Sequence, residues 1–166
     1  MAGSLIVLAE LGKADFAYLD ALRKAHYPPD RNRVPAHLTL FRSLPSSAVD
    51  EVRRSLGRAA MLPAPRATID AVMDIDGGAA LRVRSEELCE IRGRLADEFG
   101  GLLTSQDLGG WTPHVTIQNK AGERPARILL DQLRANFERR PLKVVGLQLV
   151  GYAEGEWEPL GSWRFR

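Results

Sequence analysis

Hydrophobic and polar residues recur with two different spacings along the chain, and each spacing predicts one kind of secondary structure. Short apolar or alternating runs, typical of strands, occupy residues 4–8, 37–45, 66–85, 112–120 and 143–165. Apolar residues three or four positions apart, typical of amphipathic helices, mark residues 13–26, 46–56, 86–99 and 126–137. The sequence therefore predicts strands and helices in alternation, with no low-complexity segment between them.

Two of the strand regions contain a turn and so predict hairpins. Gly77-Gly78 divides residues 66–85 into two strands, and a turn near Gly155 divides residues 143–165. Because a hairpin joins antiparallel strands, the expected fold class is α+β and not a doubly wound parallel sheet. No glycine-rich phosphate loop follows a strand, which argues against a Rossmann or P-loop nucleotide site.

One stretch of sequence occurs twice in similar form. Residues 34–56, VPAHLTLFRSLPSSAVDEVRRSL, can be aligned with residues 111–133, WTPHVTIQNKAGERPARILLDQL. Each copy has a proline shortly before a histidine, then the pattern His-aliphatic-Thr-aliphatic, a polar turn and an amphipathic helix. The two histidines, His37 and His114, lie 77 residues apart, close to half of the chain. The repeat predicts two related halves that face each other about a pseudo-two-fold axis, with a groove between them.

Strand periodicity assigns the residues of each motif to faces, because successive side chains of a strand point to opposite sides. In the first copy, His37 and Thr39 share a face with Phe41. In the second copy, His114 and Thr116 share a face with residue 120. The intervening aliphatic residues belong to the opposite faces, which we expect to pack on helices. The polar faces are then able to meet across the groove.

Two histidines and two threonines in this pattern suit phosphodiester chemistry. The nucleophile must lose a proton and the leaving oxygen must gain one, and free imidazole titrates at about 6.5. Each positioned proton transfer typically contributes about 10²–10⁴-fold in rate. The hydroxyl groups of Thr39 and Thr116 can donate to phosphate oxygens and hold the phosphorus between the imidazoles. We therefore predict His37 and His114 as catalytic residues and the two threonines as phosphate-binding residues.

Four further residues are candidates for lining the substrate site. Phe41 and Trp111 offer rings on which a base can stack, and packing in the core or at the rim is the alternative for both. Lys120 and Arg33 have the parity of the groove faces, although solvated surface charge is the common fate of such side chains.

Composition and charge remove several classes of function. The 23 basic and 21 acidic residues give a net charge of +2, too balanced for a protein that coats nucleic acid. The three histidines and one cysteine lack the spacing of a zinc site, so no metal or cofactor is expected, and His26 and Cys89 are interpreted as structural. No serine-hydrolase elbow, basic leader or apolar run near the roughly 20 residues of a membrane span is present. We expect a single bilobal domain over residues 1–166, a cytoplasmic monomer with no membrane contact and no protein partner that the sequence identifies.

HLTL at residues 37–40 and HVTI at residues 114–117, with their spacing and following helices, resemble the paired motifs of the 2H phosphoesterase superfamily. This superfamily is also called the 2′-5′ RNA ligase family, and the resemblance covers nearly the whole chain. It implies a bilobal α+β fold, in which two pseudo-symmetric lobes of antiparallel sheet, flanked by helices, surround a central groove. It also implies metal-independent chemistry and a 2′,3′-cyclic phosphate or 2′-5′ linkage in RNA or a small nucleotide as substrate. It also implies that His37 and His114 are base and acid, in an order that the sequence leaves open, and that Thr39 and Thr116 bind phosphate.

Two other interpretations fit the same residues. The groove can belong to a non-catalytic module that binds RNA ends or a nucleotide, which binding without turnover would identify. It can also belong to a phosphodiesterase for a non-RNA cyclic phosphate, such as an ADP-ribose cyclic phosphate, which competition among purified substrates would identify.

Overall fold

The computed structural model describes residues 3–166 and has an α+β architecture, in which a seven-stranded antiparallel sheet is flanked by helices. The strands are β1 (Ser4–Leu11), β2 (Leu38–Pro45), β3 (Arg66–Asp74), β4 (Ala79–Arg84), β5 (His114–Gln118), β6 (Arg140–Ala153) and β7 (Glu156–Arg164). The α-helices are α1 (Lys13–His26), α2 (Val49–Ala59), α3 (Glu86–Phe99), α4 (Ser105–Leu108) and α5 (Glu123–Ala135), with 3-10 turns at Ser46–Ala48 and Gly100–Leu102.

The predicted α+β class and both predicted hairpins are confirmed, because β3–β4 and β6–β7 are adjacent antiparallel pairs. The structure differs from the sequence prediction at several element boundaries and in one short helix. The strand β5 begins at His114 and not at residue 112, and β6 begins at Arg140, three residues earlier than expected. The short helix α4 has no counterpart in the prediction, since four residues are too few to show a helical period.

The strand order is β1-β2-β5-β4-β3-β6-β7, and β1 also pairs with β6, so that six strands close into a ring. The ring is weakest between β2 and β5, which share the single residue pair Leu38–Val115. On the other side, β6 pairs first with β3 through residues 140–143 and then with β1 through residues 144–152. These junctions separate a first lobe, formed by β2, β1, β7 and the end of β6, from a second lobe, formed by β5, β4, β3 and the start of β6.

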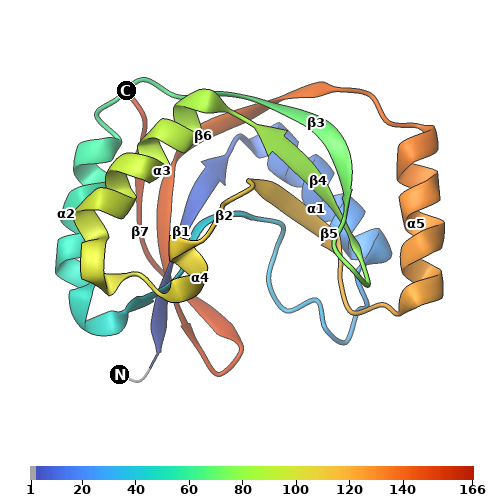
Figure 1. Ribbon diagram of the computed structural model, residues 1–166, viewed down its shortest axis with the longest axis horizontal. Helices are drawn as coiled ribbons and strands as arrows, with labels where there is room; N and C mark the ends of the chain where they lie inside the picture. The colour runs from blue at the N-terminus through green and yellow to red at the C-terminus, as the bar shows by residue number, and fades with distance from the viewer. Residues whose placement is uncertain (1–2) are drawn as a thin grey trace.

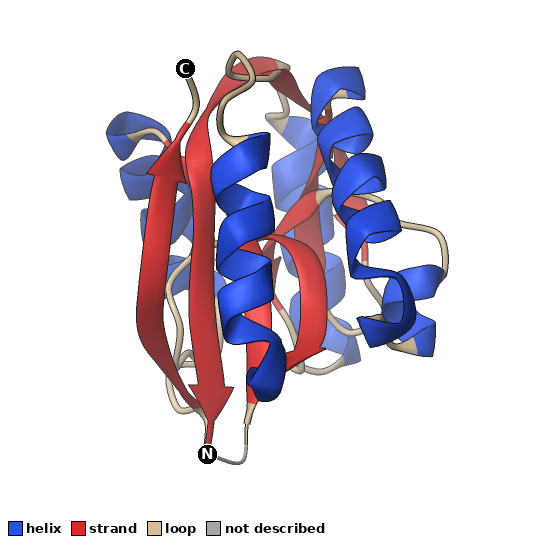
Figure 2. Cartoon of the chain, turned by 90° about the vertical axis from the view of Figure 1, so that its left-hand side faces the viewer, coloured by secondary structure: helices blue, strands red, loops and turns tan. Residues whose placement is uncertain are grey.

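Helices cover the outer faces of both lobes (Figure 1). The helices α2 and α3 pack on each other beside the first lobe, whereas α1 contacts β5 and α5 contacts β3 and β4 of the second lobe. The side view shows helices lying along the outer face of the long strands (Figure 2). The inner faces of the two lobes are left to form the groove.

The aliphatic residues of the two motifs form part of the core. Leu38, Leu40, Val115 and Ile117 are each at most 1% exposed. Their burial confirms that the apolar face of each motif strand packs in the hydrophobic core. The alternate residues of each strand therefore face the groove.

Candidate active site

A cavity of about 520 Å³ opens between the two lobes, within the range typical of small-molecule sites. Strands β1, β2, β3, β5 and β7, together with α3 and the segment around α4, contribute to its wall. Its lining residues are Ile6, His37, Thr39, Leu40, Arg42, Met73, Arg92, Gln106, Asp107, Gly110, Trp111, Thr112, His114, Thr116 and Trp157.

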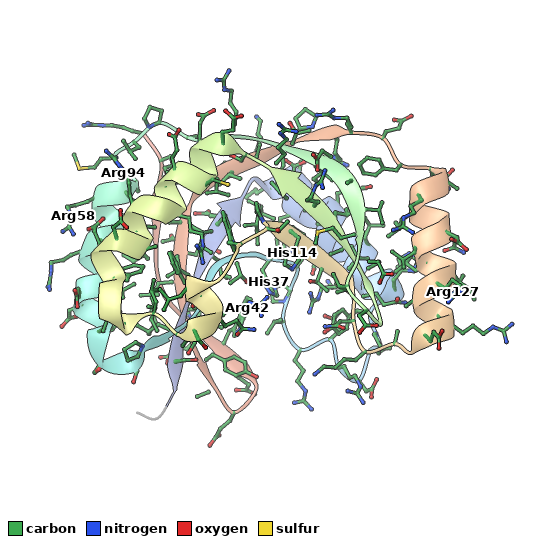
Figure 3. The ribbon with its side chains drawn as sticks, viewed as in Figure 1. His37, Arg42, Arg58, Arg94, His114 and Arg127 are labelled. Atoms are coloured by element: carbon green, nitrogen blue, oxygen red, sulfur yellow. The ribbon has the colours of Figure 1, made fainter. Side chains whose placement is uncertain are left out.

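Both motif histidines line this cavity and lie at the centre of the molecule (Figure 3). The Nδ1 atom of His37 is 2.8 Å from the carbonyl oxygen of Pro35, and Nδ1 of His114 is 2.7 Å from that of Thr112. A carbonyl oxygen only accepts hydrogen bonds, so each Nδ1 carries its hydrogen and donates. In each histidine, Nε2 is therefore the nitrogen that can take up or release a proton toward a substrate.

The same hydrogen bond recurs in both motifs because both histidines bond to the carbonyl group two residues before them. This local arrangement orients each ring without help from a second side chain. Thr39 and Thr116 line the cavity beside their histidines, as strand parity predicts for residues two positions apart.

One helix holds the backbone of both motifs. On α1, the carboxylate of Asp20 accepts the N–H of Ala36 at 3.0 Å, next to His37. One turn later, the buried Arg23 donates to the carbonyl oxygen of Thr116 at 3.1 Å. The two histidines come from different lobes, so these bonds to a shared helix fix the position of one motif relative to the other.

The surroundings of His37 favour its neutral form. Burial is the main cause and lowers the pKa of His37 to about 4, against the opposing effect of its hydrogen bond to Pro35. The positive charge of Arg23 and the neighbouring His114 lower this pKa further. The ring of Trp157 contacts His37 edge-on, with 4.8 Å between the ring centroids. At neutral pH, Nε2 of His37 is therefore an acceptor, as a general base requires.

The lowered pKa of His37 predicts that the protein loses stability on acidification. Between pH 6.5 and 4 the unfolded chain binds a proton at His37 that the folded protein does not, so the free energy of unfolding falls as the pH falls through this window. From pH 7 to pH 5 this group should contribute a loss of about 2 kcal/mol. Urea unfolding at both pH values measures it, and His37→Asn should lose about 2 kcal/mol less than the wild type. An identical pH dependence in the two proteins would contradict the assigned shift.

The prediction that Phe41 lines the groove is wrong. Phe41 is fully buried, and its ring packs edge-on against Phe99 with 5.2 Å between centroids. The cause is a β-bulge: Leu8 pairs with Thr39 but the preceding Val7 pairs with Phe41, so Leu40 is an extra residue on β2. The bulge reverses the strand parity beyond Leu40.

Of the other three candidate lining residues, one lines the cavity and two lie outside it. Trp111 lines the cavity, and its Nε1 donates to the carbonyl oxygen of Thr39 at 3.0 Å. Lys120 lies outside the cavity, exposed in the turn that follows β5, where its φ of 56° ends the strand parity used to place it. Arg33 also lies outside, beside Gly155 in the turn between β6 and β7. His26 and Cys89 are not among the lining residues either.

Ten of the lining residues were not predicted from the sequence, and four of these carry a charge or an aromatic ring: Arg42, Arg92, Asp107 and Trp157. The two oxygens of the buried Asp107 accept the backbone N–H groups of Arg42 and Ser43 at 3.0–3.2 Å. Trp157 reaches the cavity because β7 pairs with β6, far from either motif in sequence. Arg42 stands two residues after the HLTL motif, but the direction of its side chain depends on the bulge.

Within residues 3–166, no group of three or more His, Cys, Asp or Glu side chains is placed to hold a metal ion. None of the helices in this range is long and apolar enough to cross a membrane.

Comparison with known proteins supports the fold. A family model described as the 2′-5′ RNA ligase superfamily matches residues 11–156. Similar structures include TT0787 of Thermus thermophilus, with a TM-score of 0.67, 19% identity and 98% of each chain covered. LigT of E. coli complexed with 3′-AMP has a TM-score of 0.65 and 18% identity, and its complex with NADP+ has a TM-score of 0.61 and 17% identity. Both similarities cover 98% of each chain. At these identities the structures establish the fold alone. No curated protein matches the chain in sequence.

Proposed function

The chain belongs to the 2′-5′ RNA ligase superfamily, the 2H phosphoesterases, and from this membership we propose that it is a metal-independent phosphodiesterase for a 2′,3′-cyclic phosphate or 2′-5′ phosphodiester of RNA or a nucleotide. One observation carries the proposal. Two histidines from different lobes line one cavity, and each donates through Nδ1 to the carbonyl group two residues before it. Both Nε2 atoms are thereby left for proton transfer to a substrate.

In the proposed hydrolysis, Nε2 of His37 takes a proton from water as the water oxygen bonds to phosphorus. The bond between phosphorus and the leaving ribose oxygen breaks, and Nε2–H of His114 gives its proton to that oxygen. The assignment of His37 as base follows from its lowered pKa, since a histidine with a pKa of about 4 is unprotonated at neutral pH. The hydroxyl groups of Thr39 and Thr116 donate to the non-bridging oxygens, where negative charge develops.

The nucleoside part of the substrate is assigned to the aromatic wall of the cavity. Trp157 is half-buried and lies beside His37, so a base stacked on its ring would remain next to the reacting phosphate. Trp111 is instead part of the wall itself, because Arg92 covers its ring at 5.0 Å and its Nε1 is bonded to Thr39. A nucleotide ligand also agrees with the similar E. coli LigT, whose structure is known in complex with 3′-AMP.

A substrate panel with a chelator present tests the proposal. The panel contains the four nucleoside 2′,3′-cyclic phosphates, a 2′-5′ dinucleotide, its 3′-5′ isomer and an ADP-ribose cyclic phosphate. We expect turnover of the cyclic or the 2′-5′ nucleotides, undiminished by the chelator, and none of the 3′-5′ isomer. Loss of turnover in the chelator would contradict the metal-independent mechanism. Binding without turnover would identify a binding module, and turnover of the ADP-ribose compound alone would identify a non-RNA phosphodiesterase.

A further inference from the structure

Arg42 is directed by the bulge in β2. The extra residue Leu40 brings both Leu40 and Phe41 into the core, and the next side chain, that of Arg42, is exposed and lines the cavity. The backbone N–H of Arg42 is held by both carboxylate oxygens of Asp107 at 3.0 Å. Figure 3 shows Arg42 beside His37 and His114, whereas Arg58, Arg94 and Arg127 lie on the outer sides of the lobes.

The other charged groups of the cavity wall are already engaged. Arg92 donates to the carbonyl oxygens of Leu40 and Asp107, each at 2.9 Å. The carboxylate of Asp107 accepts three backbone hydrogen bonds, from Arg42 and Ser43. Arg42, in contrast, has a guanidinium group without a hydrogen bond or ion pair to any of residues 3–166. Of the two arginines that line the cavity, Arg42 is therefore the one whose whole guanidinium group is available to a ligand.

The place of Arg42 along β2 suits a phosphate other than the reacting one. Thr39, which the proposed mechanism assigns to the reacting phosphate, lies three residues earlier. At about 3.3 Å per residue, and with one residue taken up by the bulge, the two backbone positions are about 7–10 Å apart. The reacting diester carries a single negative charge, and the proposed mechanism already assigns Thr39, Thr116 and the proton donor His114 to it. Arg42 supplies a positive charge that this phosphate does not require.

We propose, on the basis of the proposed function, that Arg42 binds a second phosphate group of the substrate, about one nucleotide away from the reacting phosphate. The planar guanidinium can give two parallel hydrogen bonds to phosphate oxygens. The preferred substrate is then a nucleotide with a phosphate on its 5′ oxygen as well as the reacting 2′,3′ group. The second phosphate is either a terminal monoester or the diester of a longer chain, because both present the same pair of anionic oxygens.

Steady-state kinetics on three matched substrates test this inference: a nucleoside 2′,3′-cyclic phosphate with a 5′-hydroxyl, the same compound with a 5′-monophosphate, and a dinucleotide that ends in the cyclic phosphate. The wild type is expected to have a KM about tenfold lower for the substrates with a second phosphate, because this contact is remote from the reacting atoms and is made in the ground state. In Arg42→Gln, the ratio of the KM without a second phosphate to the KM with one should fall to about one. Arg42→Lys should restore this ratio in part.

The control is Arg94→Gln, which removes an exposed arginine of α3 and should leave the wild-type ratio of KM values unchanged. A lower KM for the 5′-monophosphate alone assigns Arg42 to a terminal phosphate, and a lower KM for the dinucleotide alone assigns it to a chain diester. Equal KM values in the wild type, or an Arg42→Gln defect of the same size on all three substrates, would overturn the inference.

A binding measurement separates failure of this inference from failure of the proposed function. Absence of turnover on every substrate would reject the phosphodiesterase, but it would leave the ligand preference measurable by calorimetry. The wild type should bind a nucleoside 3′,5′-bisphosphate about tenfold more tightly than the 3′-monophosphate. The Arg42→Gln variant should bind the two compounds with equal affinity. Equal affinity of the two compounds for the wild type would reject the second phosphate site.

Discussion

Replacing either His37 or His114 with asparagine is expected to reduce kcat on a 2′,3′-cyclic phosphate by about 10²–10⁴-fold, because each substitution removes one proton-transfer group. Asparagine is chosen because its side-chain amide can occupy the position of Nδ1 and donate to Pro35 or Thr112, while nothing replaces Nε2. The local backbone should therefore persist, and the loss should fall on kcat and not on KM. The double variant should be little slower than either single variant, since the two groups act in one step.

The matched control for the histidine variants is His26→Asn, which changes the third histidine of the chain. His26 ends α1 outside the cavity, and its carbonyl oxygen accepts a bond from Gln118 that the substitution leaves in place. The loss of kcat is measured with purified proteins, after their unfolding midpoints have been shown to match that of the wild type. Full activity in both single variants of the motif histidines would exclude the two-histidine mechanism, and a comparable loss in His26→Asn would show that the assay reports folding and not chemistry.

Replacing Asp107 with alanine is expected to lower the free energy of unfolding by about 2–4 kcal/mol, because it leaves the N–H groups of Arg42 and Ser43 without their acceptor. Asp107 is 4% exposed, so water cannot readily take the place of the carboxylate. Asp107→Asn retains one acceptor oxygen and should cost less. Unfolding in denaturant measures both losses of stability. We expect the midpoint to shift while the dependence of the unfolding free energy on denaturant concentration stays unchanged.

Asp131→Ala provides the comparison for Asp107→Ala, since Asp131 is exposed on α5 and should change stability by less than about 0.5 kcal/mol. If the Asp107 and Asp131 variants are equally stable, the carboxylate does not hold the bulged segment. A stable Asp107→Ala protein that has lost the KM preference for a second phosphate would instead show that the carboxylate acts only through the position of Arg42.

Local sequence patterns predicted the seven strands, the four longer helices and the two motif pairs of this protein, but not the short helix α4. Helical and strand periods arise from the backbone geometry of each segment, so they can be recognised without knowing its neighbours. The same holds for the pairing of His37 with Thr39 and of His114 with Thr116, because two residues on one strand lie on one face. The repeat added the expectation that the two motifs meet, and both line one cavity.

The failures share a cause, which is that side-chain direction beyond the motif depends on pairing with distant strands. Phe41 was assigned to the groove by counting along β2, but the register with β1 inserts an extra residue at Leu40. Lys120 was assigned by counting along β5, which ends two residues earlier, at Gln118. A strand period holds only while the ladder is regular, and a bulge is a property of two strands.

Spacing within short segments was sufficient to predict the α+β class, the antiparallel hairpins and the two His-x-Thr pairs. The folded chain was needed to show which other side chains complete the cavity and why the pKa of His37 is lowered. Arg42 enters it through the bulge, and Trp157 enters through the β6–β7 pairing. Burial, Arg23 and His114 lower the pKa of His37 to about 4, and these neighbours come from separate parts of the chain. The sequence around His37 does not predict this shift, because the surroundings that cause it are assembled only when the chain folds.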